Sequence, residues 1–305
     1  MKKCKIYVFS GTGNTLKIAG YYKEYLAEKY ETEIYRVEYP YNNFPDPKDA
    51  DLIGFGYPLH GFNAPEPLIK LVKNLPAVEG THTFIFKCGG EGLHANDASS
   101  HKLISILKKK NYAVYTDRHY VMPYNMIFRH KDEMVKQMVP YARALCRANV
   151  KEIFEGKKEK LCKNPFLILW SSIVRIEWWY ARFQGPFMKV DMKKCSKCML
   201  CIKNCPLHNI TFTEKNQIKI GFNCALCVCC SFNCPKNAIS IGLLNGWKVN
   251  GKYDFKGALS NKNFLFPYIT EKSTGVYRIY RKYYRECDER LKKEGISITE
   301  DDFRP

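Results

Sequence analysis

Residues 224–235, CALCVCCSFNCP, hold five cysteines within eleven positions. Residues 195–206, CSKCMLCIKNCP, have the same C-x2-C-x2-C-x3-C-P spacing. This register leaves Cys229 unmatched, because using it in place of Cys230 would break the agreement between the two copies. The two stretches therefore form an internal repeat, and its thiols indicate the fold of this part of the chain.

The spacing favours iron–sulfur clusters. A [4Fe–4S] cluster needs four thiolates at the corners of a cube, and two-residue gaps let one tight loop supply three of them. Pairs of the form C-x2-C also bind zinc, so a zinc site is the alternative. Zinc sites do not, however, call for two four-cysteine sets that each end in Cys-Pro.

The repeat resembles the bacterial two-cluster ferredoxin module. Residues 209–212 (NITF) and 237–241 (NAISI) are similar to the short strands that follow each Cys-Pro pair in that family. In such proteins the fourth cysteine of each copy ligates the cluster of the other copy. The resemblance implies two [4Fe–4S] clusters, one held by Cys195, Cys198, Cys201 and Cys234, and one held by Cys224, Cys227, Cys230 and Cys205.

The composition of the whole chain agrees with a redox protein of the cytoplasm. The chain has 305 residues, 46% of them hydrophobic, and 14 cysteines. Its length predicts about two domains. In a reducing cytoplasm, clustered cysteines bind metal or do redox chemistry more often than they form disulfides. The apolar run after the basic start MKK breaks at Ser10, so we predict no secretory signal and a cytoplasmic location.

A second motif lies near the start of the chain. Residues 4–9 (CKIYVF) indicate a buried strand, and residues 14–29 have the apolar periodicity of a helix. The loop SGTGNT at residues 10–15 joins them, and such a loop directs backbone N–H groups at a phosphate. No Gly-Lys-Ser/Thr follows, which excludes a P-loop. Leu16 stands where a G-x-G-x-x-G fingerprint needs glycine, which excludes a Rossmann dinucleotide site.

The loop resembles the FMN-phosphate loop of flavodoxins, where hydroxyls and amides rather than lysines hold the phosphate. The resemblance implies that FMN is the flavin. It also implies that the phosphate contacts come from Ser10, Thr12, Gly13, Asn14 and Thr15.

Alternating strands and helices continue through the first half of the chain. Further strands are predicted near residues 33–38, 51–56, 81–88 and 112–122, and helices near 65–75, 97–110 and 131–155. This alternation predicts an α/β doubly wound parallel sheet. The likeness to flavodoxins implies the strand order 2-1-3-4-5, and the cysteine repeat adds a small α+β ferredoxin-like domain.

In that strand order, FMN lies outside the carboxyl ends of the strands. The loops at residues 57–65 and 88–97 would then flank the flavin ring, with Tyr57 or His60 stacked on it. The predicted contacts of the ring are Tyr57, Pro58, His60, Gly89, Gly90 and Glu91.

The order of the segments resembles the flavodoxin–ferredoxin fusion family. It implies an FMN-binding domain at 1–155, a linker or interdomain helix at 156–187, a two-cluster domain at 188–245 and a C-terminal extension at 246–305. Residues 122–125 (MPYN) are similar to a Met-Pro-Asn-Asn segment of that family, with Tyr124 in place of the first asparagine.

Two further segments predict helices but no defined site. The tryptophan-rich stretch at 165–183 predicts a helix buried between the domains, and peripheral membrane contact is the less favoured interpretation. The basic, tyrosine-rich stretch at 275–295 predicts a helix docked on the ferredoxin-like domain.

The favoured function is electron transfer between redox partners through two [4Fe–4S] clusters and FMN. The alternative is an FMN-dependent reductase or oxidase of an organic substrate, an oxidoreductase with no nicotinamide fingerprint. A redox-sensing regulator is the third hypothesis, but no nucleic-acid-binding signature is present and no nucleic-acid partner is expected. The formal net charge of +19 favours an acidic redox partner, such as an acidic ferredoxin or flavodoxin.

Overall fold

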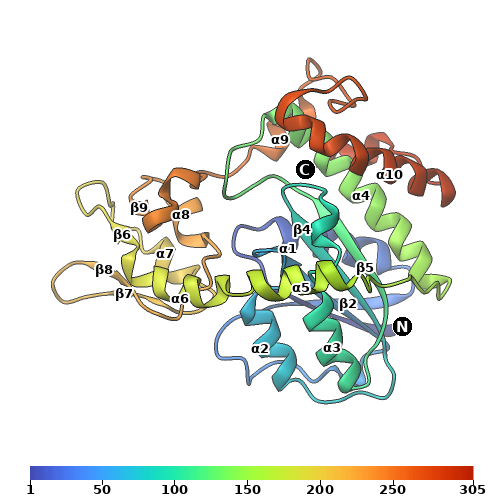
Figure 1. Ribbon diagram of the computed structural model, residues 1–305, viewed down its shortest axis with the longest axis horizontal. Helices are drawn as coiled ribbons and strands as arrows, with labels where there is room; N and C mark the ends of the chain where they lie inside the picture. Colours follow the sequence, from blue (N-terminus) through green and yellow to red (C-terminus); the bar gives the residue numbers. More distant parts are fainter. Residues whose placement is uncertain (305) are drawn as a thin grey trace.

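The computed structural model describes residues 1–304 and has a five-stranded parallel sheet at its centre (Figure 1). The strand order is β2-β1-β3-β4-β5, and every neighbouring pair is parallel. This is the predicted flavodoxin-like, doubly wound sheet. The strands are β1 (Lys2–Val8), β2 (Tyr30–Arg36), β3 (Leu52–Pro58), β4 (His82–Gly89) and β5 (Ala113–Val121).

Helices cover both faces of the sheet. The long α4 (Asp132–Phe154) and α1 (Asn14–Leu26) pack on one face, and α2 (Glu66–Asn74) and α3 (His101–Lys109) pack on the other. Side chains of a strand alternate between the faces, so Ile6 and Val8 face α1 and α4. Tyr7 on the same strand joins the opposite core.

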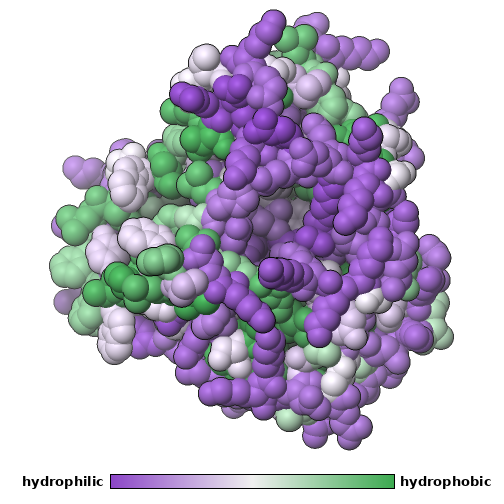
Figure 2. Space-filling view, turned by 45° about the vertical axis from the view of Figure 1, so that its right-hand side comes forward, coloured by the Kyte–Doolittle hydropathy of each residue, from purple (hydrophilic) through white to green (hydrophobic). Residues whose placement is uncertain are grey.

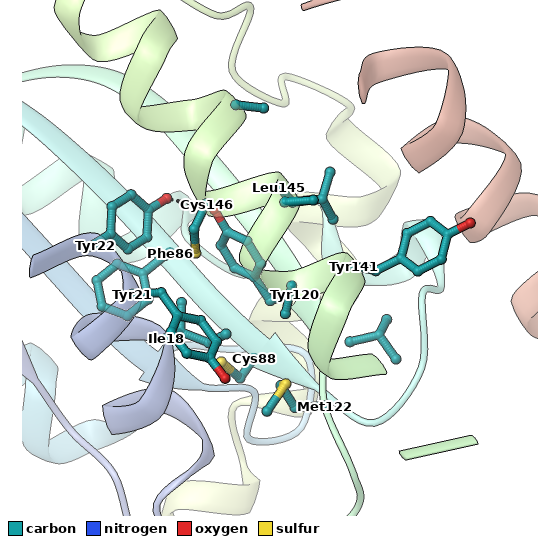
Figure 3. Packing of buried hydrophobic residues seen from close by; sticks show 14 of the residues in the cluster. Ile18, Tyr21, Tyr22, Phe86, Cys88, Tyr120, Met122, Tyr141, Leu145 and Cys146 are labelled. Atoms are coloured by element: carbon teal, nitrogen blue, oxygen red, sulfur yellow. Dashed lines mark hydrogen bonds between the residues drawn. The ribbon is translucent and has the colours of Figure 1, made fainter. Parts of the chain in front are cut away.

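A buried polar contact fixes the core under α1 and α4 (Figure 3). The hydroxyl of Tyr22 donates to Asn149 Oδ1 at 2.5 Å and lies 2.7 Å from the hydroxyl of Tyr120. Tyr22 can donate only one hydrogen, so Tyr120 donates to Tyr22. The rings of Phe84 and Phe86 pack against the Tyr22 ring, which joins α1, α4, β4 and β5.

The cysteine-rich segment forms a separate lobe beside the sheet (Figure 1). It contains two small antiparallel sheets, in which β6 pairs with β9 and β7 pairs with β8. The elements of this lobe are β6 (Lys189–Val190), α7 (Leu200–Lys203), β7 (Ile210–Phe212), β8 (Ile218–Ile220), α8 (Cys229–Phe232) and β9 (Ile239–Ser240).

Two helices replace the single linker helix that the sequence predicts. The pair α5 (Pro165–Val174) and α6 (Glu177–Phe187) run along the surface of the molecule, almost in one line (Figure 1). Their outer side chains are exposed, so the helices are not buried between the two lobes. Within residues 1–304, no helix has the length and apolar character needed to traverse a bilayer.

The C-terminal extension packs on the sheet domain. Tyr280, Tyr284 and Leu291 of α10 (Tyr280–Lys293) join the core that contains α4. The expectation that this helix docks on the ferredoxin-like lobe is therefore wrong, because its buried tyrosines face α4 instead. The remaining helices are α9 (Phe255–Ser260) and the 3-10 turns Pro47–Asp49, His94–Asn96, Gly242–Trp247, Gly275–Ile279 and Glu300–Phe303.

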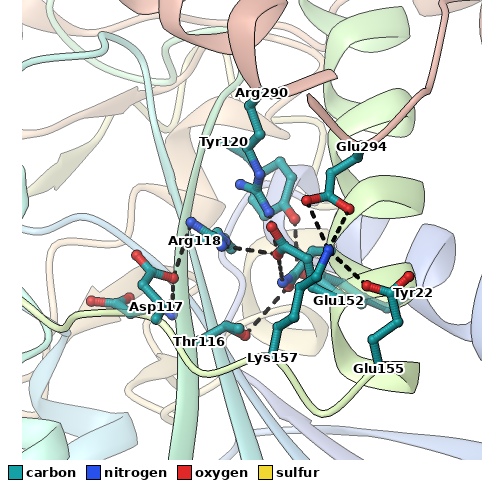
Figure 4. Close-up of polar contacts among 12 residues, drawn as sticks. Tyr22, Thr116, Asp117, Arg118, Tyr120, Glu152, Glu155, Lys157, Arg290 and Glu294 are labelled. Atoms are coloured by element: carbon teal, nitrogen blue, oxygen red, sulfur yellow. Dashed lines mark hydrogen bonds and ion pairs between the residues drawn. The ribbon is translucent and has the colours of Figure 1, made fainter. Parts of the chain in front are cut away.

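A charged network ties α10 to the sheet (Figure 4). The Glu152 carboxylate of α4 accepts from Arg118 of β5 at 2.9 Å and from Arg290 of α10 at 2.7 Å. Burial raises the pKa of Glu152, but attraction to Arg290 and Arg118 outweighs this, and the pKa is lowered. The carboxylate is thus charged and shared by two arginines inside the structure.

Replacing Glu152 by alanine should destabilise the fold, because it leaves the largely buried Arg290 without its carboxylate. We expect a loss of about 3 kcal/mol in the free energy of unfolding, near the lower end for a broken buried pair. The loss is limited because the Arg118 guanidinium keeps its second ion pair, with the Glu159 carboxylate at 3.0 Å. The control is Glu155→Ala, at an exposed residue of the same helix end. Equal denaturant midpoints for the two variants would contradict this role for Glu152.

Candidate functional site

The SGTGNT loop lies directly at the carboxyl end of β1. Gly13 adopts a left-handed backbone (φ 106°), and Ser10 Oγ accepts a hydrogen bond from the Gly13 N–H at 3.2 Å. The helix α1 begins at the next residue and has no side-chain cap. The first N–H groups of the helix therefore stay available, and with the helix dipole they form a site for an anion.

A cavity of about 500 Å³ opens beside this loop, within the range for cofactor sites. It lies at the carboxyl ends of β1, β3, β4 and β5. Nine of the predicted FMN-contact residues line it: Ser10, Thr12, Asn14, Thr15, Pro58, His60, Gly89, Gly90 and Glu91.

Two residues that were predicted to contact FMN, Tyr57 and Gly13, do not line this cavity. Tyr57 points into the core, where its hydroxyl lies 2.6 Å from Ser100 Oγ, so stacking of Tyr57 on a ring in the cavity is excluded. Tyr57 has the same strand parity as Phe55, and both belong to the core under α2 and α3. Gly13 does not line the cavity, and its contribution is the left-handed turn that starts α1.

The MPYN segment closes one side of the cavity. Asn14 Nδ2 donates to the carbonyl of Pro123 at 2.7 Å, and Asn125 Nδ2 donates to Thr12 Oγ1 at 3.1 Å. The Tyr124 hydroxyl donates to the Glu91 carboxylate. These contacts hold the phosphate loop and the loop after β4 in fixed positions around the cavity.

Residues outside the first 155 complete the cavity, and the sequence did not reveal them. Val174, Glu177 and Tyr180 come from the α5–α6 segment, and Leu226, Leu244 and Trp247 come from the cysteine-rich lobe and the turn after it. Glu177 is the one acidic residue in the tryptophan-rich stretch at 165–183, and this isolated negative charge was the only feature of the sequence that could have marked it as a cavity residue.

Two ionisable groups of the cavity have shifted pKa values. Burial raises the pKa of Glu177 to about 7, and burial lowers the pKa of His60 to about 4. At neutral pH the His60 imidazole is therefore uncharged, whereas Glu177 is close to its midpoint. A group with a pKa near the working pH can both accept and release a proton, so Glu177 is the candidate proton carrier of the cavity.

The repeated cysteines surround two further cavities. Cys195, Cys198, Cys201 and Cys234 line one, and Cys205, Cys224, Cys227, Cys229 and Cys230 line the other. The fourth cysteine of each copy thus lies at the cavity of the other copy. Within residues 1–304, no three or more His, Cys, Asp or Glu side chains are close enough together to hold one metal ion between them.

The backbone repeats along with the cysteines. Lys197 and Leu226, each two residues after the first cysteine of its copy, are left-handed, and their N–H groups donate to the Sγ of Cys195 and Cys224 at 3.4 and 3.3 Å. Further left-handed pairs are Met199 with Val228 and His208 with Asn237.

Left-handed conformations of non-glycine residues are costly and cluster at functional sites. The conformation here directs N–H groups at sulfur, where each stabilises a thiolate. The chemistry and arrangement of the donors therefore fit a multi-iron cluster in each cavity.

Cys229 occupies a different position from the repeated cysteines. It starts α8, as Leu200 starts α7 in the first copy. Its thiol donates to the carbonyl of Asn204 at 3.3 Å, and Asn233 Nδ2 donates to its sulfur at 3.6 Å. A thiol with these partners and a leucine as its counterpart is more consistent with packing than with ligation.

The phosphate loop and the second cysteine loop are in direct contact. A Cβ at position 11 would lie 2.5 Å from the carbonyl oxygen of Cys227, so only glycine permits this approach. Two further contacts secure it. The N–H of Tyr39 donates to the carbonyl of Pro206 at 2.8 Å, and Arg36 reaches the carbonyls of Ser10 and Asn204 at 3.5 Å.

Comparison with known proteins gives structural likeness only. No family model matches the chain, and no relative among characterised proteins is found. The flavodoxin of Fusobacterium nucleatum bound to flavin mononucleotide is 14% identical, with a TM-score of 0.38, over 52% of this chain and 100% of that one. Oxidised flavodoxin 1 of Bacillus cereus is 16% identical, with a TM-score of 0.36, over 50% and 98%.

The pKa of Glu177 predicts a pH-dependent stability. Because the folded-state pKa is raised, the stability that Glu177 contributes is present below pH 4.5 and is lost as pH rises through about 7. The free energy of unfolding of Glu177→Gln, relative to that of the wild type, should therefore rise by on the order of 1–3 kcal/mol between pH 5 and pH 8. Chemical unfolding at both pH values measures this. Glu79→Gln, at an exposed position, is the control, and equal shifts in both variants would refute the assignment.

Proposed function

We propose that this protein transfers electrons through two [4Fe–4S] clusters and FMN. The observation that carries the proposal is the contact between Gly11 of the phosphate loop and Cys227 of the second cysteine loop. Leu226, the neighbour of Cys227, lines both the second cysteine cavity and the cavity beside the phosphate loop. A cluster in the former would therefore lie next to a flavin in the latter.

The residues of the large cavity suit FMN. Its phosphate would bind the amides and hydroxyls of Ser10, Thr12 and Thr15 at the start of α1, without a lysine. The ring would lie between the loops after β3 and β4, beside His60 and the backbone of Gly89 and Gly90. A Cβ at Gly90 would meet the ring of Tyr124, so glycine is required there for the packing of this cavity wall.

The two cofactors complement each other chemically. When bound, an iron–sulfur cluster exchanges one electron, whereas flavin takes one or two. The contribution of the chain is to hold both at fixed separation and to keep Glu177 at the cavity for proton exchange. The partner that fits the positive surface is an acidic redox protein such as a ferredoxin or flavodoxin.

A second candidate function is an FMN-dependent reductase or oxidase that receives its electrons from the clusters. The polar groups that converge on the cavity favour it, namely Glu177, Glu91 and Tyr180. A carrier would need only an accessible flavin edge, whereas an enzyme needs space and polar groups for a substrate. Turnover of an organic substrate by the reduced protein distinguishes the two.

The cluster assignment predicts different outcomes for two adjacent cysteines. Cys229→Ser should retain about eight iron atoms per chain, while Cys230→Ser should lose part of the iron and the signal of one cluster. The two variants are a matched pair, since both alter a thiol in α8. Iron and sulfide analysis after anaerobic reconstitution measures the difference. If Cys229→Ser lost the iron instead, the assignment of Cys230 would be wrong.

The electron path predicts that flavin reduction depends on the second cluster. After mixing with a reduced acidic ferredoxin under anaerobic conditions, the wild type and Cys229→Ser should bleach the flavin, and Cys230→Ser should not. Stopped-flow absorbance follows cluster and flavin together. Flavin content of the variants, determined beforehand, serves as the control. Undiminished flavin reduction in Cys230→Ser would show that the clusters do not supply the flavin.

A further inference from the structure

The helices α5 and α6 expose large apolar side chains, whereas an ordinary surface helix exposes polar ones. Eight large apolar side chains at helical spacing face outward: Phe166, Leu169, Trp170, Ile173, Ile176, Trp179, Phe183 and Phe187. Phe166 is 80% exposed and Ile176 is 71% exposed. We call these eight residues the outer row.

The inner face of the two helices combines packed apolar side chains, such as Trp178 and Ala181, with polar contacts. Ser171 is 1% exposed, and its Oγ donates to Asn63 Oδ1 at 2.9 Å. Arg175 donates to the same oxygen at 3.3 Å, and Arg182 Nε donates to Glu66 at 3.1 Å. A helix in water usually buries its apolar stripe and exposes its polar one. An exposed apolar face of this length indicates that the outer row faces an apolar medium.

Apolar residues from the cysteine-rich lobe and the turn after it widen this surface. Phe222 follows Gly221, whose carbonyl approaches Gly185 of α6, and Leu243 follows Gly242, which lies against Gln184 of α6. Both side chains are exposed. Figure 2 shows apolar side chains gathered on the side of the molecule that carries this lobe. Contiguous apolar patches of this kind mark interaction surfaces.

The charge around the outer row identifies the partner. Residues 156–222 contain thirteen Lys and Arg against four Asp and Glu. Five exposed lysines precede or follow the row in the sequence and form no ion pair within residues 1–304, namely Lys160, Lys163, Lys189, Lys193 and Lys197. Protein–protein interfaces are depleted in lysine, whereas interfacial membrane helices combine Trp, Phe and Leu with a lysine-rich border.

We propose that the outer row and its flanking lysines dock the protein on an anionic lipid bilayer, with α5 and α6 lying in the plane of the interface. Both helices are too short to cross a bilayer, so the contact is peripheral. The tryptophans would insert at the headgroup level, and the lysines would contact lipid phosphates. This surface stands on its own observations and does not depend on the proposed electron path.

Docking would also place the cavity near the bilayer. Val174 and Glu177, at the junction of α5 and α6, line the cavity on the inner side of the same helices. The outer row would thus hold the cavity wall against the membrane, so that a redox partner in or on the membrane could reach the protein.

Vesicle sedimentation of the full chain with its clusters and flavin tests the proposal. The protein should partition at least about tenfold more strongly onto vesicles with phosphatidylglycerol than onto phosphatidylcholine alone, and rising salt should reduce this binding. Ile176→Ser with Trp179→Ser should weaken binding by at least about tenfold, because both side chains leave the apolar layer. Iron and flavin content show that the variant is folded.

The matched control is Leu265→Ser, which removes an exposed apolar residue of the C-terminal segment outside the row. It should bind vesicles like the wild type. Unchanged binding of the row variant, equal binding to both kinds of vesicle, or no binding would each overturn the proposal. A second copy of the chain could cover the row instead of a membrane, and sedimentation velocity without vesicles tests this. If the wild type formed dimers and the row variant did not, the row would be a dimer interface.

Discussion

The approach of Gly11 to the Cys227 backbone is the constraint on which the arrangement of the two lobes depends. A side chain at position 11 would separate the phosphate loop from the second cysteine loop, and Leu226 could then no longer line both cavities. The hydrogen bond from Tyr39 to Pro206 and the reach of Arg36 to both lobes hold the same interface. The absence of a side chain at Gly11 thus keeps the two cavities adjacent.

The cysteine-rich lobe has little to hold it together apart from its cysteines. Its apolar core contains few large side chains, and seven non-glycine residues of its loops are left-handed, each at a cost of about 1–2 kcal/mol. Two of these residues, Lys197 and Leu226, donate their N–H groups to cysteine sulfurs, and such hydrogen bonds are stronger when the sulfur is a thiolate. If these thiolates bind metal, as proposed, folding of the lobe and retention of the metal should be coupled.

Alternating local patterns in the sequence predicted a parallel sheet, and the spacing of the cysteines predicted the repeat. The strand order, which the structure confirms, came from the resemblance to flavodoxins, and the exchange of the fourth cysteines is a prediction from the resemblance to two-cluster ferredoxins. Strand parity would also have excluded Tyr57, since it shares the face of Phe55. The contacts that the sequence did not reveal are between distant segments. The periodicity of residues 280–291 predicts a helix but does not say whether α4 or the cysteine-rich lobe covers it. Likewise, nothing local shows that Glu177 reaches the cavity.

The two cysteine-lined cavities differ in their exposure to solvent. Cys198 is the one exposed residue among the eight repeated cysteines, and it lies at the first cavity. The second cavity shares Leu226 with the large cavity, whereas the first cavity shares no lining residue with the large cavity. Under the proposed function, the first cluster would therefore lie nearest to solvent, and the second would lie next to the flavin.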